Sequence, residues 1–164
     1  MQLQNPQELF HYDLCVMYNT EQQLTQILPT LAQEAQNDQV RQAFLDHEQE
    51  TRQHVRNLEQ CFQIIGKQPT QTTEHAVTGL KQDHDTFLQQ QPASNMLTIF
   101  DLESGAKSEY LEMAAYHNLI ASADLLGYQK CVPLLQQNLQ QEEAAAQKLA
   151  RLALQLGKQA VSSS

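Results

Sequence analysis

The sequence predicts an all-α protein: a four-helix up-down bundle whose long crossover, between the second and third bundle helices, carries a short extra helix. Only 5 Gly and 5 Pro occur among 164 residues, while Ala, Leu, Gln and Glu are abundant, which favours long helices over strands. Apolar residues recur at alternating steps of three and four along four long segments, the spacing that gathers side chains on one helix face. We expect a single domain over residues 1–160, with 161–164 as a disordered tail.

The first bundle helix is expected over residues 6–36. Asn5 is a suitable N-cap, and Pro6 suits the first helical position, where no backbone donor is needed. The apolar face of this helix is broken once, by Glu21. Pro29 removes a backbone donor further along, so we expect a kink or a division of the helix there.

The second bundle helix is expected over residues 38–65. Gly66 follows it and is suited to the left-handed conformation that ends many helices. Three polar residues, His47, Glu50 and His54, interrupt its apolar face over two turns.

A shorter amphipathic segment at 73–90 is interpreted as the extra helix on the crossover. It contains the sequence Asp83-His84-Asp85, which alone suggests a metal ligand set. Because adjacent residues diverge on a helix, we interpret this triplet as solvated surface.

The third and fourth bundle helices are expected over 95–126 and 129–157. Glu109 stands in the third helix at a position where a bundle normally has an apolar residue, and Glu112 lies one turn further on. Glu142 breaks the apolar face of the fourth helix in the same way. Each of the four long helices therefore carries at least one Glu near its middle.

These interruptions are expected to meet. Reflection about the turns near Asn37 and Gly127 puts the polar positions of each helical hairpin at one level, and stacking the hairpins centre to centre joins the two levels. A carboxylate in an apolar seam costs several kcal/mol unless a cation or a full set of hydrogen bonds compensates it. Two metal ions held between the helices are a common solution.

The expected metal ligands are Glu21, Glu50, His54, Glu109, Glu112 and Glu142. Either His47 or His54 has a spacing from Glu50 that reaches a metal, and we favour His54 because it lies level with the Glu of the first helix. His47, Tyr18 and Tyr116 are expected to lie beside the ligands, where they can hydrogen-bond to them. Aromatic packing is an equally good interpretation of the two tyrosines.

Composition excludes several other classes of function. The formal charge is −9, from 10 Lys+Arg against 19 Asp+Glu, and no basic cluster offsets it, so we expect no nucleic acid and no membrane surface as a partner. No apolar run reaches the roughly 20 residues of a membrane span, and the N-terminus lacks a secretory pattern. Three separated cysteines indicate reduced thiols. A cytoplasmic protein is expected.

Several short stretches carry a resemblance to a known family. They are Tyr18-Asn19-Thr20-Glu21-Gln22-Gln23-Leu24, Ala43-Phe44 with His47 and Glu50-Thr51, Glu109-Tyr110-Leu111-Glu112, Leu125-Leu126-Gly127-Tyr128, and Leu139 with Glu142. In these the chain resembles the YciE/YciF-type family over residues 6–157. The resemblance implies a ferritin-like, rubrerythrin-like four-helix fold, a homodimer, a link to stress responses and a di-iron or similar dimetal centre. By position it implies the same six ligands.

Two hypotheses follow for the function. The first is a dimetal carboxylate protein of stress or redox type that reacts with oxygen or peroxide, with two metal ions that we expect to be iron, manganese and zinc being the other candidates. As an enzyme it would be a di-iron oxidoreductase such as a peroxidase or a ferroxidase, and the sequence does not identify its reductant.

The second hypothesis is a non-catalytic helical dimer with a degenerate site. Ala146, where a further ligand is expected one turn after Glu142, favours the second. Iron storage in a ferritin-type cage stays open.

Overall fold

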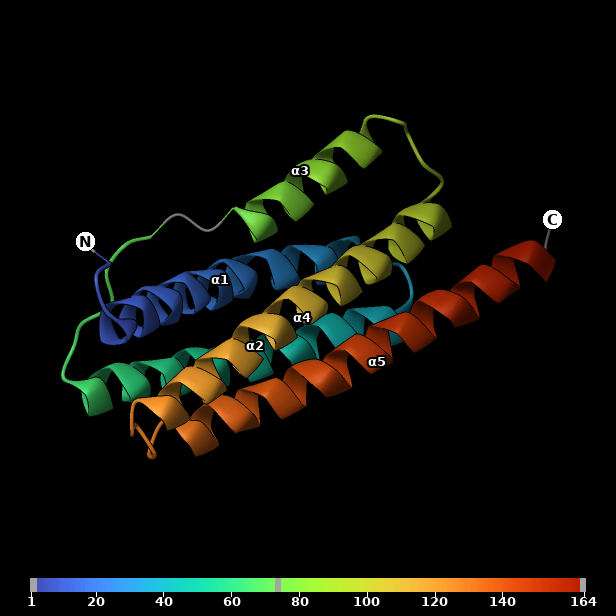
Figure 1. Ribbon diagram of the computed structural model, residues 1–164. Coiled ribbons are helices and arrows are strands. Elements are labelled where there is room, and N and C mark those ends of the chain that lie inside the picture. The colour runs from blue at the N-terminus through green and yellow to red at the C-terminus, as the bar shows by residue number, and fades with distance from the viewer. Residues whose placement is uncertain (1–2, 73–74, 163–164) are drawn as a thin grey trace.

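The computed structural model describes residues 3–72 and 75–162. The described residues form five helices and no strand (Figure 1). The helices are α1 (Pro6–Glu34), α2 (Asp38–Ile65), α3 (Ala76–Leu88), α4 (Ser94–Leu125) and α5 (Val132–Ser162). The all-α prediction, with one short helix between the second and third long ones, is confirmed.

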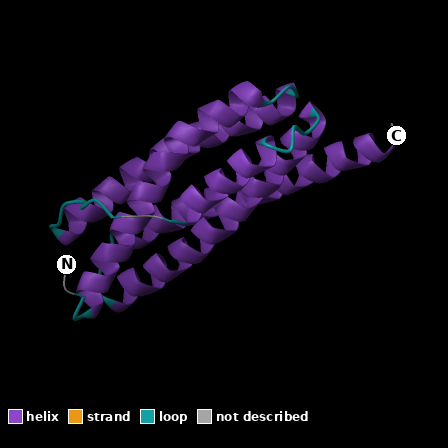
Figure 2. Ribbon diagram, turned by 90° about the horizontal axis from the view of Figure 1, so that it is seen from above, coloured by secondary structure: helices purple, strands orange, loops and turns teal. Residues whose placement is uncertain are grey.

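The four long helices form a bundle of two antiparallel hairpins, α1 with α2 and α4 with α5 (Figures 1 and 2). Because α2 and α4 run in the same direction, the chain must return along the whole bundle between them (Figure 1). The short helix α3 lies on this return segment and contacts α4 and α1. The last turns of α5 project beyond the other helices (Figures 1 and 2).

Local signals account for the helix ends. The side chain of Asn5 accepts a hydrogen bond from the backbone N–H of Glu8 at 2.9 Å, and Pro6 occupies the first helical position. Asn37 caps α2 in the same way. Gly66 ends α2 with φ of 67°, in the left-handed region that lacks a steric cost only for glycine.

Two expectations about helix continuity, a division of α1 at Pro29 and an end of α5 near Gly157, were wrong, whereas a kink at Pro29 stays a prediction. The helix α1 runs through Pro29 without division, since the flanking Leu28 and Ala32 are buried and hold the turn in place despite one missing donor. The helix α5 continues past Gly157, which costs only about 1 kcal/mol relative to Ala inside a helix. Residues 161 and 162 of the expected tail therefore belong to α5, while 163–164 lie outside the described residues, as do 73–74 of the expected extra helix.

The core consists of two apolar clusters separated by a polar level. One cluster lies towards the α2–α3 end of the bundle and contains Phe10, Leu14, Leu58, Phe62, Leu119 and Leu135 among others. The other lies towards the α1–α2 turn and contains Leu24, Leu28, Phe44, Leu102 and Leu149 among others. The polar residues between them come from all four long helices, so water is kept from them on both sides along the bundle axis.

Candidate metal centre

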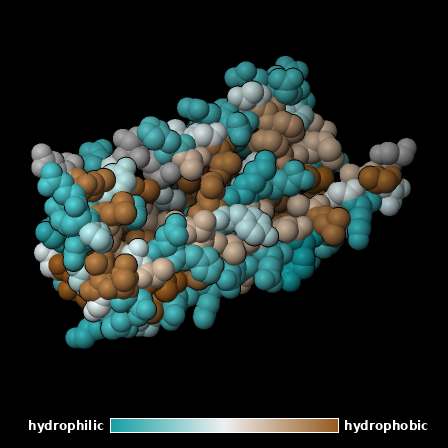
Figure 3. All heavy atoms as spheres, in the orientation of Figure 1, coloured by the Kyte–Doolittle hydropathy of each residue, from teal (hydrophilic) through white to brown (hydrophobic). Residues whose placement is uncertain are grey.

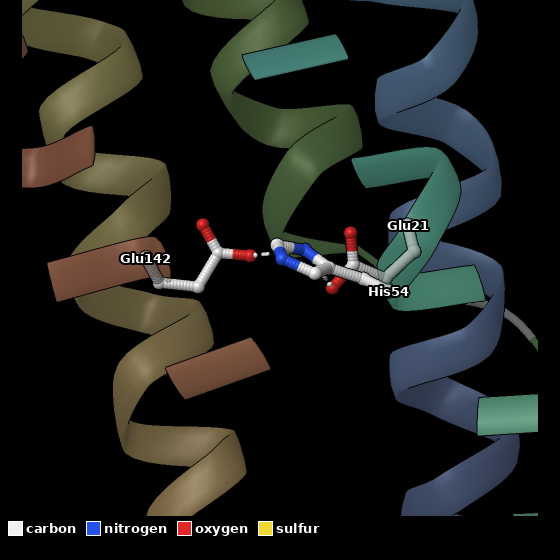
Figure 4. Close-up of side chains that lie close together, drawn as sticks. All are labelled: Glu21, His54 and Glu142. Atoms are coloured by element: carbon white, nitrogen blue, oxygen red, sulfur yellow. Dashed lines mark ion pairs between the residues drawn. The ribbon is translucent and has the colours of Figure 1, made fainter. Parts of the chain in front are cut away.

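The polar level contains a first group of three buried side chains, which we call the Glu21 triad: Glu21 of α1, His54 of α2 and Glu142 of α5. The Nδ1 atom of His54 lies 2.8 Å from Oε1 of Glu142 and 3.3 Å from Oε1 of Glu21. Figure 4 shows the imidazole ring between the two carboxylates. All three side chains are fully buried. Each can offer one ligand atom to a single ion.

A second group, the Glu109 triad, consists of His47, Glu109 and again Glu142. The Nε2 atom of His47 lies 3.1 Å from Oε1 of Glu109 and 3.7 Å from Oε2 of Glu142. Glu142 thus directs one oxygen at His54 and the other at His47. A carboxylate placed in this way can bridge two ions, because each of its oxygens belongs to a different triad.

The buried centre, meaning these two triads together with Glu112, is poorly satisfied by hydrogen bonds. Among the described residues, buried side-chain atoms without a hydrogen-bond partner are found on all six of its members, and elsewhere only on Ser104. The short contacts between imidazole and carboxylate lack hydrogen-bond geometry. Buried polar atoms normally have partners, so this concentration of orphaned oxygens and nitrogens indicates that cations are needed to compensate them.

Neighbouring polar residues fix the orientation of the Glu21 triad. The Nε2 atom of His54 lies 2.9 Å from the side-chain oxygen of Gln141, so its N–H donates to that oxygen. Nδ1 therefore faces the centre and would present a lone pair to a cation that replaces its proton. The hydroxyl of Tyr116 donates to Glu21 and accepts from the amide of Asn138 at 2.9 Å. This is the pattern by which metal-binding imidazoles and carboxylates are held in position.

The electrostatics of the centre force protons to be shared in the absence of a cation. Burial raises the pKa of Glu21 and Glu112, and it raises the pKa of Glu142 to about 7. Burial alone lowers the pKa of His54, but the charges of Glu21 and Glu142 outweigh it and raise that pKa to about 10. The pKa of His47 also lies well above its usual value, since the charge of Glu109 outweighs burial. A divalent cation can replace these protons, and the residues therefore fit a dimetal centre.

The structure exchanges the expected places of His47 and Glu50. His47, expected beside the ligands, lies inside the centre, whereas the Glu50 side chain is 41% exposed and reaches only Nδ1 of His47, at 3.6 Å. The two residues are three positions apart on α2, so a small rotation of the helix decides which one faces inwards.

Glu112 is buried as expected, but it belongs to neither triad. One of its oxygens accepts a hydrogen bond from the hydroxyl of Ser108 at 2.9 Å, and the other has no partner. It lies one turn from Glu109, and the charges of Glu142 and Glu109 add to burial in raising its pKa.

Of the tyrosines, Tyr116 contacts the centre and Tyr18 does not. The Tyr18 hydroxyl donates to the exposed side chain of Glu59 at 3.1 Å, and its ring packs edge-on against Phe62. The expected contact of Tyr18 with the ligands was therefore wrong, and the alternative of aromatic packing is confirmed for this residue. The sequence analysis missed Gln141 and Asn138. Gln141 is adjacent to Glu142 on α5 and Asn138 lies one turn before it, and that proximity to an expected ligand is the signal that could have identified them.

His84 also departs from the expectation of solvated surface. Its Nδ1 atom lies 2.8 Å from Oδ1 of the buried Asp101 on α4, and its Nε2 atom lies 3.6 Å from Glu34 on α1. Asp83 and Asp85 are exposed, as expected. His84 thus connects α3 to both α4 and α1 through these polar contacts.

A four-helix bundle with one long crossover, and with carboxylates or imidazoles directed inwards from every long helix, is typical of the ferritin-like class of helical proteins. The family model described as "Domain of unknown function (DUF892)" matches residues 5–162, so the chain belongs to this family. It is similar to Protein YciF of Escherichia coli K12, with 27% identity over 155 residues that cover 94% of this chain and 93% of YciF.

Solved structures support the same assignment. The crystal structure of the E. coli stress protein YciF matches with a TM-score of 0.89 and 26% identity, over 95% of this chain and 99% of that one. The structure of YcfI from Rhodopseudomonas palustris matches with a TM-score of 0.87 and 30% identity, over 91% of this chain and 95% of that one. The YciF-like, ferritin-like fold expected from the sequence is confirmed.

None of the described helices is long and apolar enough to cross a lipid bilayer.

Proposed function

We propose that this protein is a ferritin-like dimetal carboxylate protein of stress or redox type, with two iron ions as its metals. The observation that carries the proposal is the position of Glu142 between two buried imidazoles, each of which is paired with a further carboxylate. The relative YciF, described as a stress protein, supports the stress assignment. A homodimer, and an external reductant, belong to the same proposal.

The donor set suits iron. It offers four buried carboxylates and two imidazoles, and oxygen and nitrogen donors of this kind bind ferrous iron, with manganese and zinc as competitors. Bound iron would supply the electrons that reduce oxygen or peroxide. The residues around the centre orient the ligands: Gln141 holds His54 with Nδ1 facing the centre, and the Tyr116 hydroxyl donates to Glu21. The two apolar clusters exclude bulk water from the centre.

One observation favours the second candidate, a non-catalytic helical protein with a degenerate site. Ala146 lies one turn after Glu142, is buried, and contributes no ligand atom. Protonation of the carboxylates and imidazoles, in the directions given above, can also neutralise the centre without a metal.

Metal content and thermal unfolding separate the two candidates. The protein is purified without chelator, its metals are quantified, and melting is compared after chelator treatment and after addition of Fe²⁺, Mn²⁺ or Zn²⁺. The dimetal proposal predicts about two ions per chain and a rise in Tm, since an ion at 100 times its Kd stabilises the native state by about 2.7 kcal/mol. Absence of stoichiometric metal together with an unchanged melt would favour the second candidate.

A further inference from the structure

A cavity of about 350 Å³ lies between α1, α3 and α4, and we call it the α3 cavity. Its volume falls at the lower end of the range of small-molecule sites. It has room for about ten groups of the size of a water molecule or a methylene, taking roughly 30 Å³ for each. Glu109 and Ser108 are among its lining residues, so the cavity extends from the crossover helix to the edge of the buried centre.

The walls of the α3 cavity are apolar. They are formed by Leu24, Ile27, Leu28, Leu31, Val77 and Leu80. Apolar side chains also gather on the surface where α3 meets the first part of α4 (Figure 3). Such walls favour an alkyl chain over a polar or aqueous occupant.

Two residues that line the cavity carry buried polar atoms without partners. The hydroxyl oxygen of Ser104 and Oε2 of Glu109 are both buried, and neither has a hydrogen-bond partner. Glu109 is 2% exposed. An O–H group on a ligand can accept from a hydroxyl and donate to a carboxylate oxygen, so it suits a cavity whose lining includes both of these unpaired atoms.

Charges at the cavity exclude other head groups. Glu34, Asp101 and Glu109 all line the cavity, so a carboxylate ligand would be repelled. The lining imidazole of His84 is already paired with Glu34 and Asp101. The one Lys among the lining residues, Lys81, pairs with Asp85 at 2.7 Å and is exposed. An ammonium group would have to lose its hydration against the apolar walls and compete with metal ions at Glu109.

We propose that the α3 cavity binds a single alkyl chain of about eight to ten carbons that ends in an uncharged O–H group, a medium-chain alcohol or alkyl hydroperoxide, with this group at Ser104 and Glu109. The identification of Glu109 as the edge of a metal centre rests on the proposed function. Binding of the chain itself depends only on the cavity. The α3 cavity thus gives the proposed redox centre an apolar substrate class.

The test is calorimetric titration of the metal-free full-length protein with 1-octanol, with octanoate as the charged comparison. We expect 1-octanol to bind with one site per chain and octanoate to bind at least about tenfold more weakly, in line with the acidic lining. Octyl hydroperoxide is expected to compete with 1-octanol at a similar concentration.

Two variants locate the site. Ser104→Leu puts a larger side chain in the cavity lining and should abolish 1-octanol binding, whereas Ser122→Leu places the same side chain at another half-buried serine of α4 and should leave binding unchanged. Ser104→Ala keeps the space but removes the hydroxyl, and should weaken binding about two- to tenfold, the loss expected for one net hydrogen bond. Melting curves of the three variants establish that they are folded.

The result that overturns the proposal is absence of 1-octanol binding to the folded wild-type protein, or equal binding by Ser104→Leu and the wild type. Equal binding of octanoate and 1-octanol would overturn the assignment of an uncharged head group. Because the titration uses metal-free protein, these outcomes are independent of metal stoichiometry. A chain that binds two iron ions but no octanol loses only this inference, and one that binds octanol but no metal loses only the proposed function.

Discussion

The two triads share Glu142 but differ in how their other members are held. In the Glu21 triad, His54 is fixed by Gln141, and Glu21 accepts from Tyr116, which is itself held by Asn138. This half of the centre is enclosed and has its geometry set in advance.

The Glu109 triad is held more loosely. The second nitrogen of His47 has only the half-exposed Glu50 nearby, at 3.6 Å, and Oε2 of Glu109 has no partner. Glu109 also lines the α3 cavity. The Glu21 triad therefore has its ligand atoms held in position, whereas the Glu109 triad is the half that a molecule in the α3 cavity can reach. We expect any reaction with a substrate to occur on the Glu109 side.

The largest effect should come from the shared residue. Glu142→Gln removes a negative charge from both triads and should lower metal affinity at both positions, reducing the bound metal from about two ions per chain to less than one. Glu143→Gln, at the next position and outside both triads, is the matched control. Metal analysis after equilibrium dialysis measures the effect, and full metal retention by Glu142→Gln would show that the carboxylate does not bridge.

Glu109→Leu should affect the two triads unequally. It removes a ligand of the Glu109 triad alone, so we expect loss of about one ion per chain and retention of the other. The metal-free variant should be as stable as the wild type or up to about 1–4 kcal/mol more stable, because a buried charge is replaced by an apolar group. Denaturant unfolding checks this, and a large loss of stability without metal would mean that Glu109 has a structural role.

A smaller effect should follow from removing the hydrogen bond that orients His54 in the Glu21 triad. Gln141→Leu removes the acceptor that orients His54 and should weaken one of the two metal positions by about 10- to 100-fold while leaving the other unchanged. Competition titration with a chelator of known affinity resolves the two positions. Equal weakening of both would contradict the assignment of Gln141 to the Glu21 triad.

The pH dependence of the metal-free protein should be gradual, because it is spread over several pH units. The pKa of Glu142 is raised from 4.5 to about 7, so the folded chain keeps a proton that the unfolded chain loses in this window. The pKa of His54 is raised from 6.5 to about 10, with the same consequence at higher pH. The free energy of unfolding of the metal-free protein should therefore fall as pH rises from about 4.5 to 10.

Metal should reverse this trend, because cations compete with protons for the same atoms. The gain in Tm on adding Fe²⁺ or Mn²⁺ is expected to be larger at pH 8 than at pH 5. Thermal melts across this range, with and without metal, provide the comparison, and a metal effect independent of pH would place the ion away from the buried centre.

The sequence was sufficient for the bundle and for the level of the centre, because apolar periodicity and reflection about two turns depend only on helix geometry. Glu21, His54, Glu109 and Glu142 meet as this geometry requires. The choice between His47 and Glu50 was beyond the sequence, since residues three positions apart exchange places with a small rotation of α2.

Contacts between distant segments were equally out of reach. The partner of Tyr18 is Glu59 of α2, and the partner of His84 is Asp101 of α4, and both pairings depend on how the helices pack. The continuation of α5 through Gly157 depends on packing as well, because local propensity alone favours an end there.

The most direct test of the central claim is diffraction from iron-soaked crystals, measured on both sides of the iron absorption edge. The account predicts two anomalous peaks, one in each triad, with the Glu142 carboxylate between them and Nδ1 of His54 and Nε2 of His47 as the nitrogen ligands. An absence of peaks at the buried centre, or iron found only at the outer group of Glu34, His84 and Asp101, would contradict it.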